Sequence, residues 1–171
     1  MIILLGYMGS GKTSVGKALS KLTQWSFTDL DQYIEKKYNQ SISDLFEEGE
    51  ISFRTKEREA LLELKEELPD EHILSVGGGT PCYYDNMDVI NSMGQTVYLR
   101  TSIGNLVSRL SAEVEHRPMI ARVSEDDLPE FLGKHLFERR AFYEKASVTI
   151  DTKDSPQELA AQIWNRFQNS K

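Results

Sequence analysis

The stretch GYMGSGKT, residues 6–13, decides the fold of this 171-residue chain. Its spacing is G-x-x-x-x-G-K-[ST], and it follows the apolar run IILL at residues 2–5. Glycines such as Gly6 and Gly11 let backbone N–H groups converge on an anion, because a Cβ would block the approach or because φ must be positive. The pattern therefore predicts a buried strand, a phosphate-binding loop (P-loop), and a helix whose N-terminus also attracts the anion.

The residues of this loop have expected roles toward a bound nucleotide. Lys12 is expected to reach the β and γ phosphates as a point charge, and the Thr13 hydroxyl is expected to ligate Mg²⁺. The predicted nucleotide-binding residues of the loop are Gly9, Ser10, Gly11, Lys12, Thr13 and Ser14. A glycine-rich turn with a surface lysine is the alternative. The position between an apolar strand and an amphipathic helix favours the phosphate loop.

Composition and charge limit the class of protein. The 39% hydrophobic and 27% charged content is ordinary for a soluble globular chain, and the length suits one domain over residues 1–171. The net charge of −7 argues against a general nucleic-acid surface. A single cysteine, Cys82, leaves no internal disulfide and no Cys-based zinc cluster. With no signal-peptide pattern and no run of about 20 apolar residues, we expect a cytoplasmic monomer without nucleic-acid or membrane partners.

Short apolar runs alternate with longer helical patterns along the chain. Strands are expected at residues 2–5, 26–28, 73–76, 96–99 and 148–150. Capping boxes are expected at Ser41-x-x-Asp44, Asp127-x-x-Glu130 and Ser155-Pro156-x-Glu158. This alternation predicts an α/β fold: a parallel sheet covered by helices on both faces, with ligands at the carboxyl ends of the strands.

A pair of carboxylates ends the second predicted strand. Asp29 and Asp31 are two residues apart, and on an extended segment they would point the same way, toward the waters of a metal and a substrate hydroxyl. A polar strand end with a helix cap explains the pair equally well. Because a carboxyl group with a pKa of about 3.9 is a weak base toward an alcohol, we expect Asp31 to act mainly by positioning.

Two guanidinium groups are expected to be held in place on separate helices. Arg54 and Glu57 are three residues apart, and an exposed pair of this kind would contribute only about 0.2–0.5 kcal/mol. We therefore interpret the pair as presenting Arg54 to an anionic ligand rather than as a source of stability. Arg139, four residues before Tyr143, offers a second fixed guanidinium.

Two further stretches suggest contact with a ligand. Gly77-Gly78-Gly79 follows the third predicted strand, and three consecutive glycines would let the backbone approach a bound molecule closely. Arg117 lies in a charge-rich stretch of weak periodicity. An arginine on a mobile segment near a P-loop is a candidate for covering a transferring phosphoryl group.

Taken together, these stretches resemble the shikimate kinase family nearly from end to end. The stretches that carry the resemblance are GYMGSGKT (6–13), FTDLD (27–31), ISDLFEEGEISFRTKE (42–57), VGGG (76–79), RPMI (117–120) and ERRAFYEKA (138–146). The P-loop alone is widespread, whereas its combination with the other motifs is specific. The resemblance implies a three-layer α/β/α P-loop kinase with a five-stranded parallel sheet in the order 2-3-1-4-5. It also implies a helical substrate-binding region at residues 31–60 and a mobile lid at residues 111–123.

The resemblance further implies the reaction and its residues. ATP, with Mg²⁺, would phosphorylate the 3-hydroxyl of shikimate, a small molecule of the aromatic amino-acid pathway. The implied acceptor-binding residues are Asp31, Arg54, Gly78, Gly79 and Arg139; the arginines would bind the carboxylate and the glycines would pack against the ring. Beyond the loop, the implied nucleotide- and metal-binding residues are Arg109, which would stack on adenine, Arg117 and Asp29. The implied catalytic residues are Lys12, Asp31 and Arg117.

Two other functions stay open at this stage. A related small-metabolite kinase, such as a gluconate kinase, would share the P-loop and the lid but is expected to lack the paired Arg54 and Arg139. A non-catalytic nucleotide-binding module would be expected to have lost Lys12, Asp31 or Arg117, all of which are present.

Overall fold

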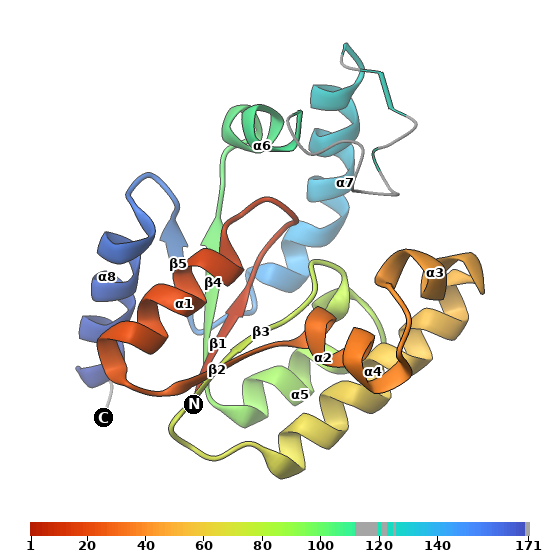
Figure 1. Cartoon of the computed structure of the whole chain (residues 1–171). Helices are drawn as coiled ribbons and strands as arrows, with labels where there is room; N and C mark the ends of the chain where they lie inside the picture. The colour runs from red at the N-terminus through yellow and green to blue at the C-terminus, as the bar shows by residue number, and fades with distance from the viewer. Residues whose placement is uncertain (112–119, 121–122, 125, 170–171) are drawn as a thin grey trace.

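Five parallel strands form the centre of the structure, a computed structural model that describes residues 1–111, 120, 123, 124 and 126–169 (Figure 1). The strands are β1 (Ile2–Leu5), β2 (Ser26–Asp29), β3 (His72–Ser75), β4 (Gln95–Arg100) and β5 (Val148–Asp151). Their order in the sheet is β2-β3-β1-β4-β5, and every neighbouring pair is parallel. The predicted α/β fold class and strand order are confirmed.

Helices connect the strands and cover both faces of the sheet. They are α1 (Lys12–Thr23), α2 (Leu30–Tyr38), α3 (Ile42–Glu47), α4 (Glu50–Glu67), the short 3₁₀ helix η1 (Thr80–Cys82), α5 (Asn86–Met93), α6 (Ile103–Leu110), α7 (Leu128–Tyr143) and α8 (Pro156–Gln168). In Figure 1, α1 and α8 lie side by side, and they also make extensive contacts with each other. None of the helices in the described part of the chain combines the length and apolar character needed to cross a membrane.

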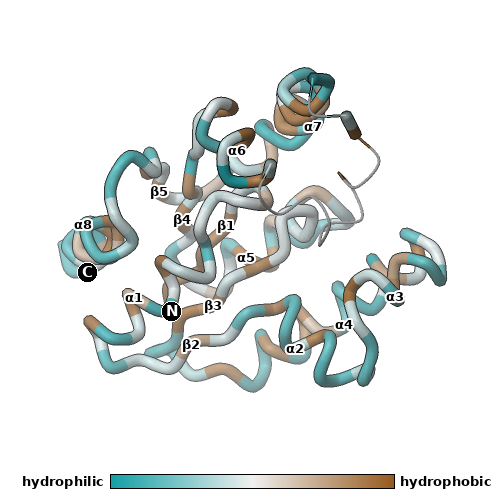
Figure 2. The backbone as a smooth tube through the Cα atoms, turned by 45° about the horizontal axis from the view of Figure 1, so that its top comes forward, coloured by the Kyte–Doolittle hydropathy of each residue, from teal (hydrophilic) through white to brown (hydrophobic). Residues whose placement is uncertain are grey.

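β1 separates two hydrophobic clusters, because successive residues of a strand point to opposite faces of the sheet. Ile2 and Leu4 belong to the cluster that α1 and α8 complete. Ile3 and Leu5 belong to the other cluster, which side chains from α2 to α7 fill. Figure 2 shows the same division, with hydrophobic segments in the strands and hydrophilic residues on the outer turns of the helices. This all-apolar strand is thus buried on both sides, and the loop that follows it emerges at the carboxyl edge of the sheet.

All three predicted helix starts are present, but the side-chain cap expected at one of them is wrong. Asp127 has a helical backbone, with φ of −86° and ψ of −15°, and its side chain caps no N–H group of α7. Its Oδ2 instead accepts a hydrogen bond from the Ser124 hydroxyl at 2.6 Å, so the local turn starts earlier than the pattern suggests. Ser41 and Ser155 form complete capping boxes at α3 and α8.

Candidate active site

The glycine loop between β1 and α1 has the backbone that its sequence requires. Gly9 and Gly11 have φ values of 76° and 90°, where other residues are strained. A Cβ on Gly6 would lie 2.8 Å from the carbonyl oxygen of Leu99. The Lys12 ammonium donates to the carbonyl oxygens of Gly6 and Tyr7 at 2.8 and 3.1 Å, so its charge lies over the loop.

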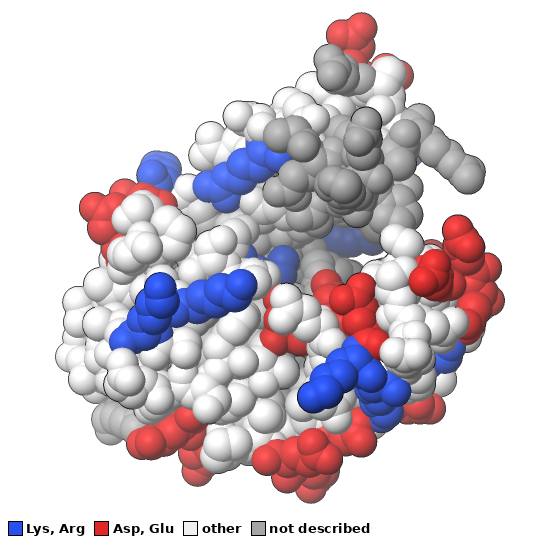
Figure 3. Space-filling view, in the orientation of Figure 1, with Lys and Arg blue, Asp and Glu red and all other residues white. Residues whose placement is uncertain are grey.

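The loop forms one wall of a cleft of about 480 Å³, here called the nucleotide cleft. The predicted nucleotide- and metal-binding residues that line it are Gly9, Ser10, Gly11, Lys12, Thr13, Ser14, Asp29 and Arg109. Thr152 and Asp154, from the turn between β5 and α8, and Pro156, the first residue of α8, also line it, and the sequence analysis did not assign them to the site. Figure 3 shows Lys and Arg side chains beside the hollow of this face, and acidic side chains both beside it and along the lower and right edges. Lys12 and Arg109 supply positive charge to the cleft, whose lining also includes the acidic side chains of Asp29, Asp31 and Asp154.

Asp29 and Asp31 meet in the cleft, although not in the predicted way. Asp29 ends β2 and is the N-cap of α2, and its Oδ1 accepts a hydrogen bond from the backbone N–H of Asp31. Asp31 therefore lies in the first turn of a helix, and the expectation of two carboxylates on one extended segment is wrong. The Asp29 Oδ2 accepts the hydroxyl of Thr13 at 2.8 Å. This contact joins the two residues that the sequence analysis assigned to Mg²⁺.

Burial, together with the charges of Asp29 and Glu57, raises the pKa of Asp31 to about 6 against the opposing effect of Lys12. The sequence analysis assumed an ordinary carboxyl pKa, which is wrong for this environment. A carboxylate whose conjugate acid has a higher pKa is a stronger base. Asp31 is therefore better suited to accept a proton from an alcohol than its residue type alone suggests.

A second cavity, of about 550 Å³, lies beside the nucleotide cleft and is here called the acceptor cavity. The predicted acceptor-binding residues all line it: Asp31, Arg54, Gly78, Gly79 and Arg139. Met8, Asp31 and Gly78 line both the acceptor cavity and the nucleotide cleft. The two spaces thus meet at the carboxylate of Asp31. A chemical group could be transferred there from a ligand in one space to a ligand in the other.

Arg54 is 4% exposed and is fixed on several sides. Its Nη1 donates to Glu57 at 2.8 Å, and its Nη2 lies 3.4 Å from Glu50. The rings of Phe46, Phe53 and Tyr83 surround the guanidinium, the last at 4.2 Å from its carbon to the ring centroid. Because Glu57 is also buried and accepts the Thr80 hydroxyl, this ion pair is rigid rather than a solvated surface pair.

The triple glycine is explained by the protein's own side chains. A Cβ on Gly77 would lie 2.8 Å from Oδ1 of Asp31, and one on Gly79 would lie 2.5 Å from Nη2 of Arg54. A Cβ on Gly78 would lie 3.2 Å from the backbone nitrogen of Met8 in the phosphate loop. The three glycines allow a carboxylate, the loop and a guanidinium to converge on one turn.

Arg139 enters the acceptor cavity from α7. Its Nη1 donates to the carbonyl oxygen of His135 at 3.2 Å, one helical turn earlier. Two more contacts bring this helix to the site: the Tyr7 hydroxyl lies 2.6 Å from Nδ1 of His135, and the Tyr143 hydroxyl donates to the carbonyl oxygen of Gly78 at 2.5 Å. The sequence analysis missed Tyr7 and His135, whose pairing spans 128 positions and leaves no local pattern.

Of the two remaining predicted site residues, Arg109 and Arg117, the structure describes only the first. Arg109 borders the nucleotide cleft and donates from Nη1 to the carbonyl oxygen of Gly9 at 3.0 Å. Arg117 lies outside the described residues, as does most of the predicted lid at 111–123. The paired arginines, the phosphate lysine and the two aspartates are brought together around the two adjoining spaces.

Sequence comparison gives a consistent result. A family model described as "Shikimate kinase" matches residues 8–168. The shikimate kinase of Parabacteroides distasonis is 45% identical over 151 residues, which cover 88% of this chain and 86% of that protein. The shikimate kinase of Flavobacterium johnsoniae is 44% identical and covers 89% of this chain and 90% of its own length.

Solved structures agree with the sequence comparison. The crystal structure of shikimate kinase from Bacteroides thetaiotaomicron superimposes with a TM-score of 0.91 at 35% identity and covers 98% of this chain and 97% of its own. The Acinetobacter baumannii enzyme, described as a complex with shikimate, gives a TM-score of 0.91 at 33% identity and covers 99% of this chain and 93% of its own. The match in sequence and fold leads to one conclusion: the chain belongs to the shikimate kinase family.

Proposed function

We propose that this protein transfers the γ-phosphate of ATP to the 3-hydroxyl of shikimate. The observation that carries the proposal is the position of Asp31, which lines both the nucleotide cleft and the acceptor cavity. A hydroxyl held beside this carboxylate would face the terminal phosphate of a nucleotide bound at the loop. Proximity of this kind supplies much of the rate acceleration in phosphoryl transfer.

The acceptor cavity suits a small hydroxylated carboxylic acid. Arg54 and Arg139 both line it, and guanidinium forks bind carboxylates with charge-assisted hydrogen bonds. The glycine backbone and the carboxylate of Asp31 leave hydrogen-bonding positions for hydroxyl groups. The curated relatives are named shikimate kinases, and the Acinetobacter baumannii structure contains shikimate, which supports this acceptor for the present chain.

Each residue of the site has a proposed task in the reaction. Lys12 stabilises negative charge on the phosphates, and the loop N–H groups hold them. Asp31 orients the attacking hydroxyl and accepts its proton late, as expected for a loose transition state in which little bonding to the nucleophile has formed. Arg117, on the proposed lid, covers the transferring group. Arg109 and Pro156 border the cleft where the nucleotide base would lie.

Thr13 and Asp29 fit a Mg²⁺ site. Their hydroxyl and carboxylate oxygens lie 2.8 Å apart at the edge of the nucleotide cleft, and oxygen donors are the ligands that Mg²⁺ prefers. Within the described ranges, no cluster of three His, Cys, Asp or Glu side chains could hold a metal by itself. This agrees with Mg²⁺ bound by one or two protein groups together with phosphates and water. When bound, the ion would neutralise charge on the phosphates.

A coupled assay with ATP, Mg²⁺ and a panel of shikimate, gluconate and nucleoside monophosphates tests the proposal. Of these acceptors, we expect only shikimate to be phosphorylated. A gluconokinase from Sinorhizobium meliloti shares the fold at a TM-score of 0.57 and 19% identity, so gluconate is the informative competitor. Preferential turnover of gluconate or of a monophosphate would show that the proposed acceptor is wrong.

Replacement of the shared carboxylate tests the proposed chemistry. Asp31→Asn is expected to keep ATP binding and to lower kcat by about 100-fold or more, because the group that orients the hydroxyl and the acceptor of its proton are lost together. Calorimetric titration with a nonhydrolysable ATP analogue measures the binding, and the coupled assay measures kcat. An unchanged kcat would remove Asp31 from the mechanism.

A further inference from the structure

Three side chains on one face of α7 contact the site. His135, Arg139 and Tyr143 are four residues apart, a spacing that places side chains on the same side of a helix. The middle residue is the proposed second carboxylate-binding arginine. The outer two form hydrogen bonds with other parts of the site, one on each side of Arg139 along the helix.

The first flanking bond joins α7 to the phosphate loop. The Tyr7 hydroxyl and Nδ1 of His135 are 2.6 Å apart, and the two rings meet edge to face with centroids 5.5 Å apart. Tyr7 is 2% exposed, so its ring has little freedom to move. The carbonyl oxygen of the same residue accepts a hydrogen bond from the Lys12 ammonium at 3.1 Å. One residue therefore touches both the phosphate lysine and α7.

The direction of this hydrogen bond follows from the two environments. Burial raises the pKa of Tyr7 to about 12, and burial and the Arg139 charge lower the pKa of His135 to about 4. Both groups are therefore neutral at pH 7. In the neutral tautomer that carries its proton on Nε2, Nδ1 accepts the hydrogen bond that the Tyr7 hydroxyl donates.

The second flanking bond joins the end of α7 to the glycine turn. The Tyr143 hydroxyl donates to the carbonyl oxygen of Gly78, whose backbone lies against the phosphate loop. Between the two bonds, Nη1 of Arg139 donates to the carbonyl oxygen of His135. The arginine is held between two attachments of its helix and is hydrogen-bonded to the residue that forms one of them.

We propose that His135 is a positioning residue for Arg139: by accepting the Tyr7 hydroxyl it fixes α7 against the phosphate loop and places the guanidinium where the acceptor carboxylate binds. The inference rests on the proposed function, since it explains how one of the two proposed carboxylate-binding arginines is positioned. It gives Tyr7, a variable position of the loop motif, a role in acceptor binding rather than in nucleotide binding.

Three substitutions test the bond, with shikimate binding measured by calorimetry and KM values measured for both substrates. Tyr7→Phe removes only the hydroxyl, and His135→Ala removes its partner. Each is expected to raise the Kd and KM for shikimate about three- to tenfold, the effect of one lost hydrogen bond, and to leave the KM for ATP nearly unchanged. His135→Asn, which can place an acceptor near the Nδ1 position, is expected to restore most of the affinity. Equal shikimate affinity in the wild type and in Tyr7→Phe would overturn the inference.

A double-mutant cycle separates positioning from direct contact. If His135 acts through Arg139, then His135→Ala should have little further effect on shikimate affinity in an Arg139→Ala background. Additive effects would show that His135 acts on the acceptor directly or through general destabilisation, and the inference would be wrong. Because Tyr7→Phe is a small change, it keeps the test valid if His135→Ala folds poorly.

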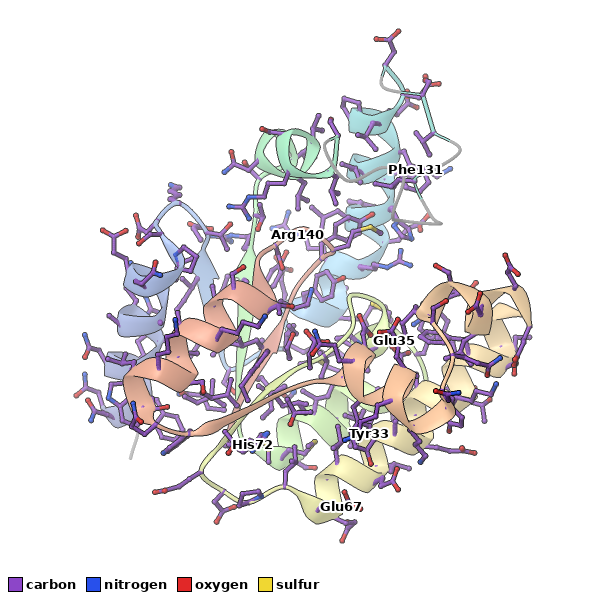
Figure 4. All side chains as sticks on the ribbon, viewed as in Figure 1. Tyr33, Glu35, Glu67, His72, Phe131 and Arg140 are labelled. Atoms are coloured by element: carbon purple, nitrogen blue, oxygen red, sulfur yellow. The ribbon has the colours of Figure 1, made fainter. Side chains whose placement is uncertain are left out.

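His72 provides a matched control. It is a buried histidine with one side-chain hydrogen bond, to Thr28 at 2.9 Å, and Figure 4 labels it at the start of β3, far from α7. His72→Ala is expected to lower stability without changing shikimate affinity, and a matching loss of affinity would count against a specific role for His135. A wild-type protein that does not bind shikimate at all would instead refute the proposed function, so the two failures are distinguishable.

Discussion

Burial and the nearby carboxylates Asp29 and Glu57 raise the pKa of Asp31 to about 6, so the free protein ionises this group at a cost in stability. Because the folded state binds the proton of Asp31 more tightly, this group contributes fully to folding stability below pH 3.8, its unfolded pKa. The contribution is lost as the pH rises through about 6, its folded pKa. The residue that we propose as the proton acceptor is therefore unfavourable for the unliganded fold when it is ionised.

Asp31→Asn is expected to raise the free energy of unfolding relative to the wild type by up to about 3 kcal/mol at pH 7, because the shift is about two pKa units. The difference should shrink as the pH falls from 7 to 4 and stay constant above 7. Denaturant unfolding without nucleotide or metal, at a series of pH values, measures it. A difference that does not change with pH would show that the ionised carboxylate is not strained in the free protein.

Gly79 and Gly104 form a matched pair for testing the close packing on Arg54. A Cβ on Gly79 would lie 2.5 Å from Nη2 of Arg54, whereas a Cβ on Gly104, in α6, meets no atom within 4 Å. Gly79→Ala is expected to raise the KM for shikimate at least about tenfold by displacing the guanidinium, a loss of about 1.4 kcal/mol in binding. Gly104→Ala should leave the KM unchanged and add about 0.5–1 kcal/mol of stability. Similar KM values for the two variants would contradict this packing.

At the scale of helices, two capping boxes serve different spaces. Ser41 starts α3, and the first residues of α3 line the acceptor cavity. Glu35 adds a second attachment, because its Oε1 accepts the backbone N–H of Ile42 at 3.0 Å (Figure 4). Ser155 is the N-cap of α8 and lies between Asp154 and Pro156, which line the nucleotide cleft. Loss of the capping hydroxyl at one helix should therefore weaken the binding of one substrate, and the same loss at the other helix should weaken the binding of the other.

Ser41→Ala and Ser155→Ala are each expected to cost about 1 kcal/mol in unfolding free energy. The first should raise mainly the KM for shikimate, and the second mainly the KM for ATP, because each loosens one wall of one space. Steady-state kinetics with either substrate varied, together with thermal unfolding, gives all four values. If both variants change the same KM, the two spaces do not bind the proposed ligands separately.

The elements show what the sequence can and cannot predict. The P-loop and the capping boxes at Ser41 and Ser155 depend on residues close in sequence, and the structure has them as predicted. Asp127 precedes α7 as predicted, but its side chain does not cap the helix, because its Oδ2 accepts the Ser124 hydroxyl instead. The pKa of Asp31 and the contact between Tyr7 and His135 depend on burial and on distant segments, which no local pattern contains.

At the scale of the whole molecule, the two tryptophans lie on one side of the sheet. Trp25 and Trp164 pack with Phe167, with ring centroids 5.3 to 5.6 Å apart. They adjoin the cluster formed with α1 and α8, whereas Arg54 and Arg139 project from α4 and α7, the helices of the other cluster. The fluorescent side chains are thus separated from the acceptor cavity by the sheet.

Tryptophan emission is expected to stay unchanged when shikimate binds and to shift to longer wavelength on unfolding in denaturant. A fluorescence titration run beside calorimetry tests this, since calorimetry reports the occupancy independently. Quenching that follows the calorimetric saturation curve would mean that acceptor binding rearranges the face that carries α1 and α8.

The absence of a side chain at Gly78 has a consequence for inhibitor design. This residue lines both spaces, and a Cβ there would already lie 3.2 Å from the backbone of Met8. A bisubstrate compound that joins an adenine nucleotide to a cyclic acid would have to cross this junction. Its linker should be slender and able to accept hydrogen bonds there, since bulky connecting groups would collide with main-chain atoms that cannot move aside.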